Sequence, residues 1–230
     1  MALPLLNDTP KYELKIPSTG KKVKFRPFLV KEEKVLLVAA ESKDPNLMIS
    51  TIIDTIKACV QSNVNVDSLT TFDLEYLFIQ LRAKSVGERA PLKIKCESCE
   101  AENDYEVDFD DIKCVVKQKD NVIKLTDDIS VEMKYPSYNE LRDTDDEEEA
   151  GLNVLHSCIS AVLTPDDRID VADEPVESVK NFINSMTADQ FKKISEFATN
   201  IPKVEYDIDF DCEKCGEHTH IELRGVQDFF

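Results

Sequence analysis

The sequence lacks several features that common catalytic classes require. Its 230 residues include no tryptophan, only five glycines and only three histidines. It has no glycine-rich phosphate-binding loop and no Gly-x-Ser-x-Gly nucleophile elbow. Two of the three histidines, His218 and His220, lie in one short stretch, which makes a Cys–His or Ser–His catalytic arrangement hard to build. We therefore expect that the protein is not an enzyme.

Signals for a membrane or for secretion are also lacking. No apolar run approaches the roughly 18 residues of a membrane-spanning helix. The first ten residues have neither the basic nor the apolar region of a signal peptide. The odd count of seven cysteines argues against a secreted disulfide framework. We expect a soluble protein of a reducing cytosol, with no membrane partner, and in that compartment paired thiols favour a metal.

Two Cys-x-x-Cys pairs are the strongest chemical signal that is present. Cys96 and Cys99 form one pair, and Cys212 and Cys215 form the other, with 112 residues between the two pairs. Apolar and polar residues alternate on both sides of each pair, which predicts two strand–turn–strand hairpins. Two thiolate pairs on two hairpin tips suit one tetrahedral zinc ion with sulfur ligands. The sequence therefore predicts a structural Zn²⁺ site made of these four cysteines, in a zinc ribbon split by a long insertion.

Other interpretations of the cysteine pairs remain open. A redox Cys-x-x-Cys motif needs a helix N-terminus to lower a thiol pKa, and a strand follows each pair here. A vestigial site without metal is another alternative, and His218 could compete as a ligand, although a solvated hairpin histidine is the simpler interpretation. Closing the long loop costs about 2 kcal/mol more than closing a short one, against roughly 10–16 kcal/mol from structural zinc in peptides. The remaining cysteines fit small core residues: Cys59, Cys114 and Cys158.

The pattern along the chain predicts an α+β fold with three parts. Residues 1–87 are expected to form a β-hairpin followed by a helical bundle. Residues 88–111 and 202–230 are expected to form the split zinc-ribbon module. Residues 112–201 are expected to form an inserted α/β segment, with strands near 113–134 and a helical stripe from Leu152 to Leu163. Polar residues 165–174 predict a loop, and two helices then follow before Pro202.

The net charge of −18 is spread unevenly along the chain. Residues 140–177 carry 13 acidic and 2 basic side chains, with the densest run at residues 143–149, whereas residues 1–34 carry 8 basic and 4 acidic ones. A solvated acidic face is one interpretation, and a surface that holds a basic partner is the other. In either case the negative field repels phosphate, which argues against nucleic acid as the main partner.

The N-terminal part resembles a known family. The string over residues 12–34 joins a Pro-Ser-Thr-Gly hairpin to Arg-Pro-Phe-Leu-Val-Lys-Glu-Glu-Lys, and residues 54–60 and 72–87 continue the same pattern. These segments resemble the baseplate hub assembly proteins of T-even-like contractile-tailed bacteriophages. The likeness is strongest over about the first 90 residues, and the split cysteine pairs agree with it. The acidic run at 143–149 matches no motif of the family.

The resemblance implies a non-enzymatic role in building the central hub of the tail baseplate. Partners would be other phage tail proteins, either hub components or the tape-measure protein. The protein would act in the host cytoplasm during assembly, as a chaperone-like factor, or stay in the virion baseplate as a hub subunit. The alternative that the ribbon alone suggests is a zinc-ribbon nucleic-acid-binding regulator.

Overall fold

A computed structural model describes residues 9–116, 120–142 and 150–224. The chain forms two compact units. Unit 1 combines the stretch up to Val66, Phe72–Val116 and the stretch from Lys203, whereas unit 2 combines Asp67–Thr71 and Lys117–Pro202. Each unit contains helices and small antiparallel sheets, so the predicted α+β class is confirmed.

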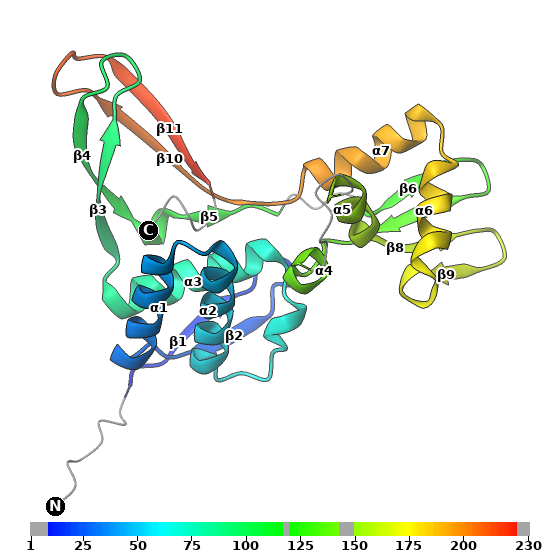
Figure 1. The fold of residues 1–230 in the computed structure, drawn as a ribbon, viewed down its shortest axis with the longest axis horizontal. Coiled ribbons are helices and arrows are strands. Elements are labelled where there is room, and N and C mark those ends of the chain that lie inside the picture. Colours follow the sequence, from blue (N-terminus) through cyan, green and yellow to red (C-terminus); the bar gives the residue numbers. More distant parts are fainter. Residues whose placement is uncertain (1–8, 117–119, 143–149, 225–230) are drawn as a thin grey trace, which may run out of the picture. The chain divides into compact units, whose positions relative to one another are not determined.

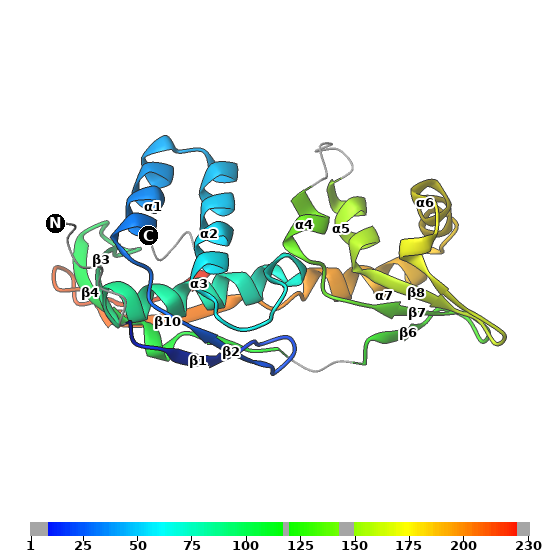
Figure 2. The same ribbon diagram turned by 90° about the horizontal axis from the view of Figure 1, so that it is seen from below.

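The N-terminal part of unit 1 is a hairpin followed by three helices. Strands β1 (Tyr12–Lys15) and β2 (Lys22–Phe25) pair antiparallel, as predicted, and Gly20 takes the positive φ of 66° that the turn needs. Helices α1 (Val30–Ser42) and α2 (Pro45–Cys59) pack against each other and lead to α3 (Thr71–Val86). In Figure 2, α1 and α2 lie on one side of α3, and the β1–β2 hairpin lies on the other.

Local signals in the sequence explain where these helices begin. The Asp44 carboxylate accepts hydrogen bonds from the amides of Asn46 and Leu47, which makes it the N-cap of α2, with Pro45 in the first helical position. Helix α1 begins at Val30, before the apolar run that starts at Val35. The cause lies in the side chains at its first turn, described below.

Two long hairpins and a short strand complete unit 1. Strand β3 (Arg89–Lys95) pairs with β4 (Glu102–Asp108), and β10 (Val204–Asp211) pairs with β11 (His218–Arg224). Figure 1 shows the two hairpins side by side, with their tips adjacent. Strand β5 (Lys113–Cys114) pairs with the start of β10, so it extends the second hairpin to three strands.

One apolar cluster joins both hairpins to α3. Its buried members come from α3, from β3 and β4, from the turn after β4, and from β10. The members from the strands occupy inward positions of the alternating pattern. They are Ile79, Ala83, Ala90, Ile94, Val107, Phe109, Ile112, Val204 and Ile208. A two-stranded hairpin is marginally stable alone, so this cluster is needed to hold the base of each hairpin.

Unit 2 is an antiparallel sheet covered by helices. The sheet order is β6 (Val122–Lys124), β7 (Ser130–Met133), β8 (Ile159–Leu163) and β9 (Arg168–Asp170). The helices are α4 (Tyr138–Arg142), α5 (Ala150–Cys158), α6 (Val176–Asn184) and α7 (Ala188–Thr199). Its core contains residues of unit 2 alone, among them Val131, Met133, Leu155, Ile159 and Ile194.

Two predictions within unit 2 are wrong. The helical stripe from Leu152 to Leu163 ends at Cys158, because Ile159–Leu163 forms strand β8 and pairs with both β7 and β9. The polar stretch 165–174, predicted to be a loop, contains β9, which pairs with β8. The acidic run at 143–149 lies outside the described residues. No helix in the described part of the chain is long and apolar enough to cross a membrane.

Candidate metal centre

The structure brings the four predicted ligands together at the tips of the two long hairpins. Cys96 and Cys99 follow β3, and Cys212 and Cys215 follow β10. One sulfur atom from each of the four cysteines lies within 4.8 Å of every other. The Sγ atoms of Cys96 and Cys215 are 3.7 Å apart, as are those of Cys99 and Cys212. We call these four residues the cysteine cluster.

The sulfur separations fit one tetrahedral metal ion. With a Zn–S bond of about 2.3 Å, the edge of a regular tetrahedron of sulfurs is about 3.8 Å. A disulfide would need about 2.05 Å, so the 3.7 Å separations belong to free thiols. Four sulfur donors at this spacing suit Zn²⁺ and leave no open position for a reactive water.

The two tips have the same backbone conformation. In the first tip, the Cys96 amide donates to Ala101 O and the Glu100 amide donates to Cys96 O, both at 2.9 Å. The second tip repeats both bonds, from Cys212 and Gly216, at 2.9 and 2.8 Å. The residue after the second cysteine is left-handed in both tips, with φ of 56° at Glu100 and 72° at Gly216. This turn aims both sulfurs of each pair at one point.

Backbone amides at the tips favour thiolates at the first cysteine of each pair. The amides of Cys99 and Ser98 hold the pKa of Cys96 below its ordinary value. The equivalent amides of Cys215 and Lys214 lower the pKa of Cys212 to about 6. At Cys215 the Glu217 amide also favours the thiolate, but the three neighbouring sulfurs and burial raise its pKa to about 12. A bound divalent cation would favour the thiolate form of Cys215 despite the neighbouring sulfurs, because a metal-bound thiol is deprotonated.

A second link joins the hairpins beside the cysteine cluster. Asn103, buried in β4, accepts a hydrogen bond of 3.0 Å from the amide of Glu213 and donates one of 3.0 Å to Ala101 O. In the other direction, the buried Thr219 hydroxyl of β11 lies 3.7 Å from the Cys96 sulfur. The two hairpins therefore hold each other by reciprocal contacts.

Asn103 and Thr219 were missed by sequence reasoning, although a signal for them existed. Each lies four positions after the second cysteine of its own pair. The same offset in two tips of the same conformation places the two side chains at equivalent positions, facing the opposite hairpin. The cysteine cluster with these two residues thus has approximate twofold symmetry, which also explains why Cys96 pairs with Cys215 and Cys99 with Cys212.

The other candidates lie outside the cluster. His218 is exposed, and its Nδ1 lies 3.0 Å from the Asp211 carboxylate. Burial raises the pKa of Cys59 to about 11, and of Cys114 and Cys158 to about 12, so these thiols stay protonated at neutral pH.

The N-terminal string also has a structural role. Arg26 and Glu32 form an ion pair of 2.9 Å with largely buried side chains, and Glu32 also accepts the Leu29 amide at 2.8 Å. These contacts fix the start of α1 at Val30. The Ser18 amide and hydroxyl both donate to the buried Asp73 of α3, at 2.9 and 2.6 Å.

Three comparisons with known proteins bear on the family of this chain. A search of curated proteins and a search of solved structures each found no match. Comparison with protein families matched the family described as T4 bacteriophage base plate protein over residues 9–230. The match covers the N-terminal string, the helical region and both cysteine pairs. The chain therefore belongs to the T4 bacteriophage base plate protein family.

Proposed function

We propose that the chain is an assembly protein of the phage baseplate hub that acts by binding other tail proteins. The observation that carries this proposal is the family match over residues 9–230, since the family is defined by the baseplate. The resemblance of residues 12–34 to hub assembly proteins supports the more specific hub role. We propose no catalytic activity, because the cysteine cluster leaves no open metal position.

The proposed role of the metal is to hold unit 1 in shape. Cys96, Cys99, Cys212 and Cys215 would bind one Zn²⁺ ion, supported by the 3.7 Å sulfur separations. We keep the three-part division as part of this proposal, with residues 88–111 and 202–230 as the split ribbon. The ion would then tie together two segments far apart in sequence and fix the surfaces of the N-terminal helices.

Helix α1 offers a surface suited to a protein partner. Leu36 and Ala39 face inward, while large apolar side chains on the opposite arc are exposed: Val30, Val35, Leu37 and Val38. Exposed Lys31 and Lys34 lie on the same arc, so this surface mixes apolar and basic side chains. Clustered exposed apolar side chains commonly mark protein interfaces. We infer that a hub or tape-measure protein covers this arc in the assembling tail.

The alternative of a nucleic-acid-binding ribbon is disfavoured by the exposed face of β10. Glu205, Asp207, Asp209 and Asp211 alternate with inward residues and are all exposed. Binding to nucleic acid depends on Lys and Arg contacts to phosphate, and four carboxylates in succession repel phosphate. A ribbon used to read DNA would need the opposite charge on this face.

Co-expression with the hub and tape-measure proteins of the same phage tests the proposal. We expect the chain to co-purify with one of them at moderate salt. Val38→Asp should abolish this, whereas Val176→Asp, at a valine of similar exposure on α6, should not. If none of the proteins co-purifies with the unaltered chain, the hub proposal fails. If Val176→Asp is as damaging as Val38→Asp, the α1 surface is not the contact.

Mass spectrometry of finished particles separates the two forms of the hub role. Copies of the chain in mature tails identify a hub subunit located in the virion baseplate. Its absence from mature tails, together with co-purification from infected cells, identifies a transient factor of the host cytoplasm. We favour the transient factor, as the resemblance to assembly proteins implies.

A further inference from the structure

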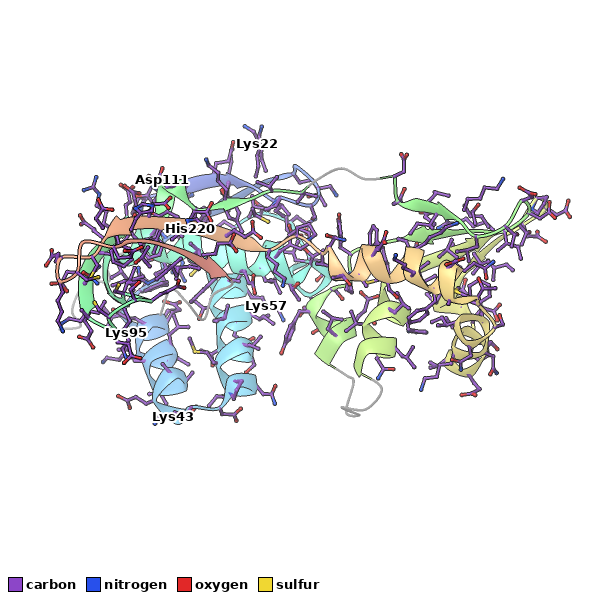
Figure 3. The ribbon with its side chains drawn as sticks, turned by 90° about the horizontal axis from the view of Figure 1, so that it is seen from above. Lys22, Lys43, Lys57, Lys95, Asp111 and His220 are labelled. Carbon is purple, nitrogen blue, oxygen red and sulfur yellow. The ribbon has the colours of Figure 1, made fainter. Side chains whose placement is uncertain are left out.

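A second group of metal-ligating side chains lies on the β10–β11 hairpin, away from the cysteine cluster. Asp207, His220 and Glu222 each offer a ligand atom, and these three atoms all lie within 4.8 Å of one another. Asp207 lies five residues before Cys212, which corresponds to about 17 Å along a strand. All three side chains are exposed, and Figure 3 labels His220 on β11. We call this group the histidine–carboxylate cluster.

The strand register places the three side chains on one face. Asp207 lies directly opposite Glu222, and Asp209 lies directly opposite His220. Because side chains alternate across a strand, these four share the outward face, opposite the buried Ile208. Directly opposed cross-strand residues have Cβ atoms about 4.5–5.5 Å apart, and diagonal neighbours are within reach of longer side chains. His220 is the diagonal neighbour of Asp207, so one ion can reach all three.

Two further observations indicate that this group suits a cation. Like charges directly opposite each other destabilise a hairpin, and Asp207 and Glu222 are such a pair. His220 Nδ1 lies 2.9 Å from the Asp209 carboxylate. With Nδ1–H donating to Asp209, His220 Nε2 carries the lone pair that binds metals. A carboxylate on the second ring nitrogen is the usual support of a metal-ligating histidine.

We propose that Asp207, His220 and Glu222 form a second metal site, which binds one divalent ion of the Zn²⁺ class through one imidazole nitrogen and two carboxylate oxygens. Imidazole with carboxylates suits borderline ions such as Zn²⁺, whereas four thiolates are the softer set. Ligand atoms bound tetrahedrally at about 2.1 Å lie about 3.4 Å apart, so the exposed side chains need to approach one another by at most about 1.4 Å to bind the ion.

The proposed site has consequences that differ from those of the cysteine cluster. Three protein ligands leave coordination positions for water or for a side chain of another protein, whereas four sulfurs leave none. The site is exposed and has fewer ligands, so it should bind more weakly and exchange faster. It goes beyond the proposed hub function and does not depend on it.

Equilibrium dialysis of the full-length protein against buffered Zn²⁺, followed by metal analysis, tests the site. We expect two zinc ions per chain at high free Zn²⁺, with affinities separated by several orders of magnitude. His220→Ala and Asp207→Asn should each abolish the weaker site and keep the tighter one. Asp209→Asn keeps all three proposed ligands but removes the carboxylate that contacts His220 at 2.9 Å and His218 at 3.6 Å, and it should weaken the second site about 10- to 100-fold.

His218→Ala is the matched control, because His218 is a histidine of the same hairpin that lies outside the histidine–carboxylate cluster, with Nδ1 3.0 Å from Asp211 and Nε2 3.6 Å from Asp209. It should retain both ions. Retention of the tighter ion in every variant shows that the hairpins remain folded. The proposal is overturned if the unaltered chain binds one ion only, which would leave the acidic face for a basic protein partner. It is also overturned if His218→Ala lowers the weaker affinity as much as His220→Ala does.

Discussion

Loss of one sulfur ligand should unfold the two long hairpins and leave unit 2 intact. The change is Cys99→Ser, which nearly keeps the size of the side chain but replaces the sulfur atom that lies 3.7 Å from the Cys212 sulfur. Three remaining sulfurs cannot complete the tetrahedral set that a structural zinc site uses. The ion should then be lost or bound far more weakly, and with it the strongest link between β3–β4 and β10–β11.

The magnitude follows from ligand linkage. A ligand present at 1,000 times its dissociation constant stabilises the folded state by about 4 kcal/mol, and structural zinc in small peptides contributes roughly 10–16 kcal/mol. A loss of at least about 4 kcal/mol is a large part of the 5–15 kcal/mol that typical domains have. Amide exchange in the four hairpin strands should therefore be about a thousandfold faster.

Hydrogen exchange with mass spectrometry, together with zinc analysis, measures both effects in one sample. Cys114→Ser is the control, because Cys114 is a half-buried cysteine of β5 outside the cysteine cluster. It should keep one tightly bound zinc ion and slow exchange in β3, β4, β10 and β11. Exchange in β7 and β8 should stay slow in both variants, since the core of unit 2 contains only its own residues.

The reasoning is refuted if freshly purified protein contains no zinc, or if Cys99→Ser leaves exchange in the hairpins unchanged. Uniformly faster exchange in both units would also contradict it, because it would mean that the ion stabilises the chain as a whole. Chelation of zinc from the unaltered protein should reproduce the Cys99→Ser pattern. That result would exclude an effect of the serine itself.

Four further substitutions have predicted outcomes. Asn103→Ala should lower the unfolding free energy of unit 1 by about 2 kcal/mol, since it removes two hydrogen bonds of about 1 kcal/mol each. Gly216→Ala should cost about 1 kcal/mol for its left-handed conformation, and Glu100→Gly should relieve a similar strain. Glu32→Gln should cost about 2–3 kcal/mol at neutral pH, because it breaks a charged hydrogen bond to Arg26 in a buried pair. Denaturant unfolding measures all four.

The pH dependence of Glu32→Gln has a defined sign. Burial alone would raise the pKa of Glu32, but hydrogen bonds from Arg26 and the Leu29 amide lower it below the ordinary value of 4.5. A lowered folded pKa means that the carboxylate stabilises the fold above pH 4.5 and that this contribution is lost as the pH falls further. The difference in stability between the unaltered protein and the Glu32→Gln variant should therefore shrink below about pH 4; a constant difference would contradict the ion-pair explanation.

Controls distinguish the other three predictions from general damage. Asn103→Ala should leave the zinc content at one tight ion, because the cysteine cluster is unchanged; loss of zinc would mean that Asn103 positions a ligand. A Cβ at Gly216 would meet no atom within 4 Å, so its cost comes from the backbone alone. If Glu100→Gly destabilises unit 1, the two tips are not equivalent.

Local signals in the sequence predicted much of this fold. Two start signals are visible in the sequence: Asp44 with Pro45 at the start of α2, and the capping box of Thr187 with Gln190 at the start of α7. Alternation predicted both long hairpins. The run Ile159–Leu163 was misassigned because a short apolar segment fits a helix and a strand equally well. Pairing with β7 and β9 makes this run a strand, and a short window of sequence around the run does not show that pairing.

In the candidate metal centre, too, features set by neighbouring residues were predictable, whereas contacts between residues far apart in the sequence were not. Cys-x-x-Cys spacing predicts which sulfurs share an ion, because both ligands of a pair come from one turn. The bond from the Glu213 amide to Asn103 joins residues 110 positions apart, and no local pattern contains it. The histidine–carboxylate cluster depends on the register of β10 with β11, which is seen only once the second hairpin is built.

Two separate devices hold unit 1, one formed by contacts of the N-terminal string and the other by the proposed zinc ion. At one end, the Arg26–Glu32 pair and the Ser18–Asp73 bonds fix α1 and α3 to the first hairpin. At the other, the proposed zinc ion in the cysteine cluster would tie β3–β4 to β10–β11. Helix α3 supplies Ile79 and Ala83 to the apolar cluster at the base of those two hairpins, so both devices act on the same helix. Loss of zinc should therefore leave the Ser18–Asp73 contact formed while the hairpin tips separate, and Ser18→Ala should leave zinc binding unchanged.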